Sequence, residues 1–319
     1  MRVLDPAAER DFLVSVLGAE PTAIERPQSG EWSSVYAIRR GNEELVVRFS
    51  RFRDDFEKDR VAAGWSSPAL PVPEVLDIGE ALGVAYAVSR RAHGEFLETL
   101  DEARARAILP RLFAALDAQR EIDLFGTTGY GLWTASGGGI QTAWREVVLA
   151  VGETVPPGRA AGWRERLESS PTGAGPFDEA HALLRELAEH CPEERHLVHD
   201  DLLNRNVLVA GDHITAVLDW GSSMFGDPLW DLALLVYGQK WFPGSRGIDF
   251  VAEAERHYAA IGLMVPHLRE RVRCYAVRQG LAGMSYCAWK GEERWDELAW
   301  HAARTLAFAR GEGARPESA

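Results

Sequence analysis

The 319-residue sequence contains few cysteines and no long apolar run, and both absences limit what the protein can be. Its three cysteines, Cys191, Cys274 and Cys287, form no CxxC pair, which fits free thiols in a reducing cytoplasm, and we assign them no catalytic role. No stretch approaches the roughly 20 apolar residues that cross a bilayer, and the charged N-terminus lacks the apolar core of a signal peptide. We therefore expect a cytoplasmic protein with no membrane partner.

The sequence also lacks a surplus of basic residues. Its 35 Lys and Arg residues stand against 48 Asp and Glu residues, which gives a formal net charge of −13. Without a basic stripe to displace counterions from phosphates, we expect no nucleic-acid partner. A negative field would attract a cationic small molecule. Acidic surfaces also keep proteins soluble, and on charge alone this second explanation is favoured.

The pattern of apolar and polar residues changes near residue 94 and divides the chain into two parts. The first part shows helical spacing over 8–18, two strand-like runs joined around Gly41-Asn42, a charged helix at 53–65 and further strands up to 91. These patterns predict a small antiparallel sheet. The second part shows mainly helical spacing, and Pro110 is expected to start, kink or divide a helix within 97–124.

Glycine-rich segments at 126–139 and 169–176 are expected to be loops, and four helices are expected after residue 228. We predict an α+β architecture with two lobes: an N-terminal nucleotide-binding lobe at 1–93, and a larger helical lobe at 94–319 with the catalytic loop and the acceptor site.

The segment 199–220, HDDLLNRNVLVAGDHITAVLDW, carries the main chemical signal. Two apolar runs flank AGDH and predict a β-hairpin. With its centre between Asp212 and His213, Asn206 falls opposite Asp219, and facing residues in a hairpin have Cβ atoms only about 5 Å apart. An amide oxygen and a carboxylate side by side suit Mg²⁺. Asp201 lies five residues before Asn206, close enough to act on a substrate beside that metal.

This spacing matches the phosphoryl-transfer layout of kinases, in which a catalytic-loop Asp precedes a metal-binding Asn and a second metal-binding Asp follows a hairpin. Asp201 would then accept or orient the proton of the attacking hydroxyl, while Asn206 and Asp219 hold the metal. His199 is expected to brace the catalytic loop, and Asp200 to be solvated or to cap the loop. The alternative is a surface hairpin whose Asx residues only satisfy turns.

Asp231 lies where a helix is expected to begin, and two roles are open for it. It could face back toward the catalytic loop and hold it in place, or it could stabilise the N-terminus of its own helix.

The nucleotide side of the reaction falls on the N-terminal part. The segment SGEWSSVY (29–36) could cradle phosphates through backbone N–H groups and hydroxyls. Taken alone, such a segment is more often an ordinary turn, and it gains value only from Asp201, Asn206 and Asp219. The candidate cradle residues are Ser29, Gly30, Ser33 and Ser34. Arg90 and Arg91, in the segment 89–92, are expected to form the hinge near the adenine through backbone groups.

Arg48 in LVVRF occupies the position of the usual phosphate-binding lysine, and Asp59 in FEKDR is the carboxylate expected to orient it. Arginine can pair with phosphates but is not interchangeable with lysine. The alternative for Arg48 is an edge-strand arginine that faces water.

With these residues in place, the chain resembles the aminoglycoside phosphotransferase family over roughly residues 25 to 305. The resemblance is carried by ALPVPEVLDIGE (69–80), SRRAHG (89–94), HLVHDD (196–201), NVL (206–208), ITAVLDW (214–220) and MFGD (224–227). It implies a protein-kinase-like two-lobed fold, ATP with Mg²⁺, and phosphorylation of a hydroxyl on an aminoglycoside antibiotic such as hygromycin B, which confers resistance. An arginine in place of the usual lysine also fits this family.

The catalytic loop departs from the family, with Leu202, Leu203 and Arg205 where smaller or polar residues are usual. Arg205 could assist phosphate binding or repel a cationic drug, so the acceptor is left open. Another small alcohol, such as a macrolide or a choline- or homoserine-like molecule, is the alternative. A non-catalytic nucleotide-binding module would need a broken catalytic position, and Asp201, Asn206 and Asp219 are all intact. GTP in place of ATP, and a monomer or a weak dimer, also remain open.

Overall fold

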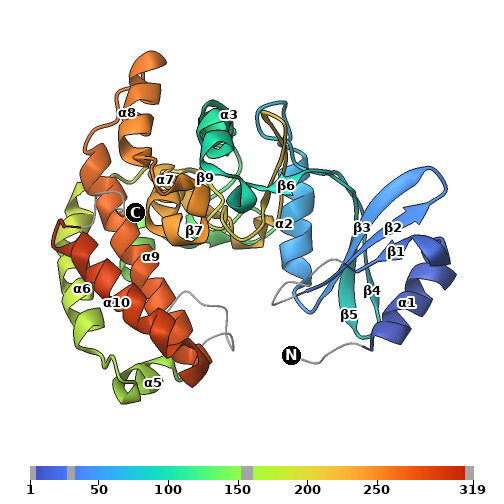
Figure 1. Cartoon of the computed structure of the whole chain (residues 1–319), viewed down its shortest axis with the longest axis horizontal. Helices are drawn as coiled ribbons and strands as arrows, with labels where there is room; N and C mark the ends of the chain where they lie inside the picture. The colour runs from blue at the N-terminus through green and yellow to red at the C-terminus, as the bar shows by residue number, and fades with distance from the viewer. Residues whose placement is uncertain (1–4, 27–32, 152–160, 313–319) are drawn as a thin grey trace. The chain divides into compact units, whose positions relative to one another are not determined.

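The computed structural model describes residues 5–26, 33–151 and 161–312, and the contacts of the chain divide it into two compact units (Figure 1). Unit 1 comprises Met1–Phe96 and Arg205–Ser222, and unit 2 comprises Leu97–Asn204 and Ser223–Ala319. The antiparallel sheet in the N-terminal region and the helical C-terminal part confirm the predicted fold class. The assignment of nucleotide binding to residues 1–93 and of the acceptor site to residues 94–319 stays a prediction.

Unit 1 is built on a five-stranded antiparallel sheet with the order β1-β2-β3-β5-β4. Its strands are β1 (Ile24–Glu25), β2 (Ser34–Arg40), β3 (Glu43–Ser50), β4 (Val75–Ala81) and β5 (Val84–Arg90). The hairpin expected around Gly41-Asn42 joins β2 to β3, with Gly41 at φ +59°, a conformation that glycine adopts without strain.

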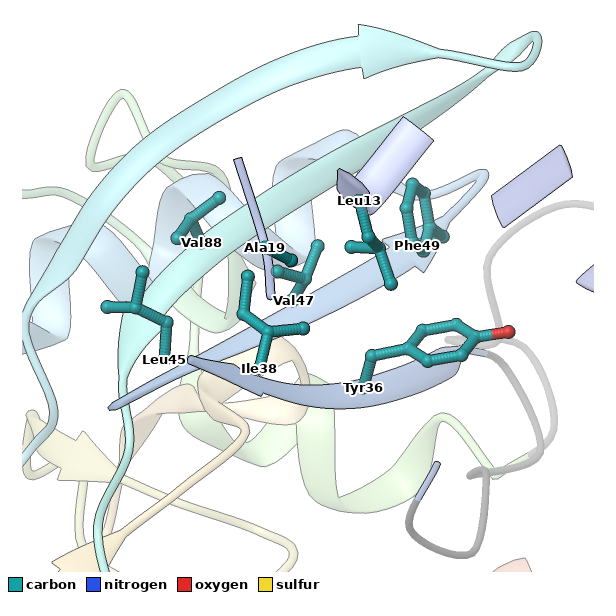
Figure 2. Close-up of a cluster of buried hydrophobic side chains, with 8 residues drawn as sticks. All are labelled: Leu13, Ala19, Tyr36, Ile38, Leu45, Val47, Phe49 and Val88. Atoms are coloured by element: carbon teal, nitrogen blue, oxygen red, sulfur yellow. The ribbon is translucent and has the colours of Figure 1, made fainter. Parts of the chain in front are cut away.

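The two faces of this sheet pack against different helices. Alternate residues of β3, Leu45, Val47 and Phe49, are at most 2% exposed and belong to one buried cluster with Leu13 of α1 (Pro6–Ser15), which lies next to Phe49 in Figure 2. A second buried cluster joins Phe56 of α2 (Arg53–Ala63) to Ile78, Ala85 and Ala87 of β4 and β5. Burying each large apolar side chain contributes about 1.5–3 kcal/mol, so the period-two pattern fixes both helices.

The remaining part of unit 1 is the hairpin from the second half of the sequence. It consists of β10 (Val207–Ala210) and β11 (His213–Val217), and β10 also pairs with β6 (Glu95–Phe96). The short 3₁₀ turn at Trp220–Ser222 follows the hairpin and packs on α2.

Unit 2 combines a small sheet with helices. The sheet has the order β8-β7-β12-β9, with β7 (Tyr130–Trp133), β8 (Gly139–Gln141), β9 (His196–Val198) and β12 (Met224–Gly226). Strand β7 lies inside the segment 126–139, so the expectation that this whole segment is a loop is wrong. Glycine is poor in strands by propensity, but β7 buries Gly131 and Trp133, and tertiary contacts prevail.

The helices of unit 2 include the four expected after residue 228. These are α7 (Leu229–Tyr237), α8 (Phe250–Ala260), α9 (Leu268–Lys290) and α10 (Trp295–Ala309). Figure 1 shows α9 and α10 running side by side, next to α6 (Gly175–Leu187). The shorter α4 (Trp144–Leu149) and α5 (Trp163–Ser169) precede α6.

Helix α3 (Glu102–Arg120) runs through Pro110 without a break. An interior proline costs about 3 kcal/mol or more. The helix buries Ile108, Leu109, Leu112 and Phe113 around that position, and this burial offsets the cost. None of the helices in the described part of the chain is long and apolar enough to span a bilayer.

Candidate active site

In unit 2, the predicted catalytic loop follows β9 and is held by a buried carboxylate. Asp231 of α7 is fully buried; its Oδ2 accepts the backbone N–H of His199 at 2.8 Å, and its Oδ1 accepts that of Asp200, also at 2.8 Å. Gln119 of α3 also donates to Oδ2, at 2.6 Å. Of the two roles open for Asp231, the structure confirms the first: it faces back and ties down the loop.

Burial raises the pKa of Asp231 to about 6, because desolvation outweighs the hydrogen bonds from His199, Gln119 and Asp200 that lower it. The carboxylate is therefore ionised at neutral pH and can accept these donors.

His199 lies inside the loop and contacts the predicted catalytic residue through the backbone. Its ring is fully buried, and its Nδ1 accepts the backbone N–H of Asp201 at 3.2 Å. The Asp201 carboxylate is half-buried and accepts a hydrogen bond from the Asn204 side chain. This placement favours a bracing role for His199, while the chemical role of Asp201 stays a prediction.

Asp200 is neither simply solvated nor a loop cap, contrary to the expectation from sequence. It adopts φ +65°, which is uncommon for a residue with a side chain, and its Oδ1 accepts hydrogen bonds from the Trp230 indole and from Gln279 at 3.2 Å. Leu202 and Leu203 are buried, with Leu203 against Gly238. The unusual leucines of the loop therefore belong to the core of unit 2.

In unit 1, the hairpin that carries Asn206 and Asp219 has a different register from the predicted one. Its turn is Gly211-Asp212, and Val207 pairs with Val217. Asn206 therefore lies opposite Leu218, and the backbone carbonyl of Asn206 accepts the Leu218 N–H at 2.7 Å. The prediction that Asn206 faces Asp219 is wrong. The turn is centred between Gly211 and Asp212, one position earlier than predicted, which moves the partner of Asn206 two residues toward the N-terminus. A bulge opposite Leu208 and Val209 places an extra residue in β11 and moves that partner back by one, to Leu218.

Asn206 and Asp219 still lie at the same end of this hairpin. Asn206 is buried, whereas Asp219 is exposed and adopts φ +59°. Amide and carboxylate oxygens are the ligands that Mg²⁺ prefers, with phosphate oxygens and water completing its shell. By donor type the two residues fit this ion, and their roles as ligands stay predictions.

Arg48 and Asp59 form an ion pair within unit 1. Arg48 lies on β3, a central strand between β2 and β5, which excludes the alternative of an edge-strand arginine in water. The second oxygen of Asp59 accepts the backbone N–H of Trp220 at 2.8 Å, so Asp59 connects Arg48 to the residue after Asp219. The guanidinium also lies over the Phe56 ring, 5.0 Å from its centroid.

Electrostatic effects indicate that Asp219 lies near this ion pair. Burial raises the pKa of the Asp59 carboxyl, Arg48 opposes that shift, and the Asp219 carboxylate adds to it. Asp59 and Asp219 in turn raise the pKa of Arg48 against the effect of burial. A phosphate near Arg48 would thus meet a cation that two carboxylates keep charged.

Lys58 was not predicted as a functional residue. It is 2% exposed, and its Nζ donates to the carbonyl of Gly221 at 2.6 Å. Together with Asp59, it fixes α2 to the turn after Asp219. The one sequence feature that could have indicated a role for Lys58 is its position next to Asp59. Gln119 was also missed, because its contacts with Asp231 and the carbonyl of Leu197 span long separations.

The remaining predicted nucleotide residues are placed as follows. Ser29 and Gly30 lie outside the described residues, Ser33 precedes β2, and Ser34 is its first residue. Arg90 pairs with Glu74 at 2.8 Å and Arg91 with Glu25 at 3.0 Å, and their backbone N–H groups donate to carbonyls of Glu74 and Glu44. Their roles in nucleotide binding stay predictions.

Arg205 also belongs to unit 1, whereas Asp201 belongs to unit 2. The guanidinium of Arg205 lies over the ring of Phe96, 5.7 Å from its centroid. Because the predicted machinery divides between the two units, the approach of Asp201 to Asn206 and Asp219 stays a prediction.

Comparison with known proteins places this chain in a family. The model of the phosphotransferase enzyme family matches residues 24–269. The hygromycin-B 4-O-kinase of Escherichia coli is 34% identical over 285 residues, which are 88% of this chain and 79% of that protein. The crystal structure of a thermostable mutant of aminoglycoside phosphotransferase APH(4)-Ia, in ternary complex with AMP-PNP and hygromycin B, aligns with a TM-score of 0.80 at 32% identity. That alignment covers 94% of this chain and 97% of the other.

The fold is shared more widely. The microcompartment-associated aminopropanol kinase aligns with a TM-score of 0.66 at 16% identity, over 98% of this chain and 99% of the other, which shows the fold alone. The chain belongs to the phosphotransferase enzyme family, and its predicted resemblance to the aminoglycoside phosphotransferases is confirmed. It is a phosphotransferase with the kinase-like fold of that family.

Proposed function

We propose that this protein transfers the γ-phosphoryl group of ATP to a hydroxyl of hygromycin B or of a closely related aminoglycoside, and thereby confers resistance. The similarity to hygromycin-B 4-O-kinase, 34% identity over most of both chains, is the observation that carries this proposal. The relative solved with AMP-PNP and hygromycin B supports the nucleotide and the acceptor. The net charge of −13 also suits a polycationic substrate.

In the proposed reaction, Asp201 orients the acceptor hydroxyl and takes its proton as the oxygen attacks the γ-phosphorus, while ADP leaves. The bonds from Asp231 and His199 hold the loop, so Asp201 is positioned before the substrate arrives. Arg48 interacts with the nucleotide phosphates, kept in place by Asp59. Asn206 and Asp219 would hold Mg²⁺, which neutralises phosphate charge when bound.

The supply of ATP locates this activity in the cytoplasm, and the protein acts as a monomer or a weak dimer.

Purified protein should release ADP from ATP in the presence of Mg²⁺ and hygromycin B, and not with kanamycin, a macrolide or choline. A sensitive bacterium that expresses the gene should then grow on hygromycin B and fail to grow on kanamycin. ADP release only with one of the other alcohols would replace the proposed acceptor while leaving the phosphotransferase in place. ADP release that no acceptor stimulates would contradict both the acceptor and the transfer reaction.

A further inference from the structure

Helices α9 and α10 bring together three side chains that can bind a metal ion, and they share no residue with the proposed phosphoryl-transfer site. Cys287 lies on α9, and Glu297 and His301 lie one turn apart on α10. Their ligand atoms lie within 4.8 Å of one another, with Cys287 fully buried and His301 5% exposed. Because Zn²⁺ lies about 2.0–2.3 Å from its ligands, atoms so spaced need only small movements to share one ion.

The hydrogen bonds that link His301 to Tyr237 and Thr305 determine which nitrogen of His301 can bind a metal. The Thr305 hydroxyl donates to the carbonyl of His301 at 2.6 Å, so toward Tyr237 it can only accept, at 3.2 Å. The Tyr237 hydroxyl therefore donates to Thr305, and its oxygen accepts the Nδ1–H of His301 at 2.8 Å. Because His301 is only 5% exposed, the uncharged ring is the favoured form here. Nε2 is left with its lone pair.

This lone pair faces a second acceptor. Nε2 lies 4.0 Å from Oε1 of Glu297, beyond hydrogen-bonding range, and the other oxygen of Glu297 accepts a hydrogen bond from Arg294 at 2.5 Å. The Cys287 thiol carries a single proton, which it can donate to only one of the two acceptors, Nε2 of His301 or Oε1 of Glu297. A metal ion in place of that proton would satisfy the sulfur, the nitrogen and the oxygen together.

The His301 ring is also held in a fixed place. A Cβ atom added at Gly283 would lie 2.2 Å from its Cε1, and one added at Gly280 would lie 2.0 Å from the Thr305 hydroxyl. A glycine inside a helix costs about 1 kcal/mol. These two glycines let α10 approach α9 closely and fix the direction of Nε2. Metal ligands are typically oriented by such a surrounding shell.

We propose that Cys287, Glu297 and His301 bind a divalent transition-metal ion of the Zn²⁺ type, which fastens α10 to α9. Thiolate, imidazole and carboxylate are ligands that Zn²⁺ accepts, with water as the fourth. On binding, the Cys287 thiol releases its proton to solvent as the metal–sulfur bond forms. Lys240, Arg294 and Arg304 place positive charge nearby, and the thiolate and Glu297 carboxylate offset part of it.

Titration of the metal-free full-length protein with Co²⁺ tests this site. We expect a thiolate-to-cobalt charge-transfer band that saturates at one equivalent and disappears when Zn²⁺ is added. The oxygen ligands Asn206 and Asp219 cannot give such a band. Cys287→Ser should abolish it, whereas Cys191→Ser, a matched change at another thiol, should leave it intact.

Two further variants keep the proposal testable if Cys287→Ser does not fold. Glu297→Gln alters a partly exposed side chain and should weaken Co²⁺ binding at least about tenfold, and Tyr237→Phe should weaken it about 10- to 100-fold by removing the partner of Nδ1. Zn²⁺ should also raise the Tm of the wild type more than that of Glu297→Gln. Absence of a sulfur band at millimolar Co²⁺, or unchanged affinity in both variants, would overturn the proposal.

Discussion

The carboxylate of Asp59 accepts the backbone N–H of Trp220 at 2.8 Å, and this bond joins α2 to the residue that directly follows Asp219. The other oxygen of the same carboxylate holds Arg48. One side chain therefore positions both the cation predicted to bind phosphate and the acid predicted to bind metal.

Replacing Asp59 should affect stability and nucleotide binding together. Asp59→Ala leaves the largely buried charge of Arg48 without its main partner, and breaking such a pair costs up to about 3–5 kcal/mol. Urea unfolding should show this loss, and calorimetry should show weaker binding of ATP with Mg²⁺. Glu57→Gln is a suitable control, because it removes solvent-accessible ion pairs with Arg53 and Arg60 on the same helix and should cost at most about 1 kcal/mol. Equal effects of the two substitutions would contradict the role assigned to Asp59.

Replacing Asp201 should separate chemistry from binding. Asp201→Asn keeps the size of the side chain and removes the base, so kcat should fall by about 10²- to 10⁴-fold. ATP affinity, measured by calorimetry, should stay within a few-fold of the wild type. Near-full activity in this variant would remove Asp201 from the mechanism.

The proposed metal ligands can be tested against a carboxylate of the same hairpin. Asp219→Ala and Asn206→Ala should each weaken binding of the nucleotide in the presence of Mg²⁺. Asp212→Ala changes an exposed residue in the Gly211-Asp212 turn and should leave that binding unchanged. If Asp219→Ala binds the Mg²⁺ nucleotide as the wild type does, the hairpin does not form the metal site.

The raised pKa of Asp231 predicts that the stability of the folded protein depends on pH. Its pKa is raised from 3.8 to about 6, so the folded state binds a proton more readily than the unfolded chain between these values. The contribution is fully present below pH 3.8 and is lost as pH rises through 6, a change on the order of 3 kcal/mol. Comparing urea unfolding of the wild type and Asp231→Asn from pH 4 to 7 should show a steeper decline in the wild type. Parallel curves would show that Asp231 does not titrate in this range.

The same protonation should affect catalysis in the opposite direction. Below pH 6, a protonated Asp231 accepts the backbone N–H groups of His199 and Asp200 more weakly, so the loop that carries Asp201 loosens. We expect kcat to fall as pH drops through about 6 while the fold becomes no less stable.

The sequence predicted the parts of this protein that depend on local pattern. The two strand-like runs joined around Gly41-Asn42 predicted a hairpin, and the spacing of Asp201, Asn206 and Asp219 predicted a kinase-type hairpin. Arg48 and Asp59 were paired correctly because the kinase-like layout requires a cation on a strand and a carboxylate on the following helix.

What the sequence did not predict depends on tertiary contacts. The turn at Gly211-Asp212 and the bulge in β11 together place Asn206 opposite Leu218, and Thr215 in the bulge donates to the carbonyl of His93, more than a hundred residues away. Lys58 and Gln119 likewise act through partners far along the chain. Such contacts leave no periodic signal, because they follow from how separate elements pack.

The two bonds that fix α2 have a consequence for regulation. In protein kinases, movement of the corresponding helix breaks its ion pair with the phosphate-binding lysine and switches the enzyme off. Here Lys58 and Asp59, neighbours on α2, form hydrogen bonds with the adjacent residues Gly221 and Trp220, and both residues are at most 5% exposed. A helix anchored in this way cannot move away from the turn at Trp220–Ser222 without breaking two buried bonds at once, and this holds the ion pair of Arg48 and Asp59 in place.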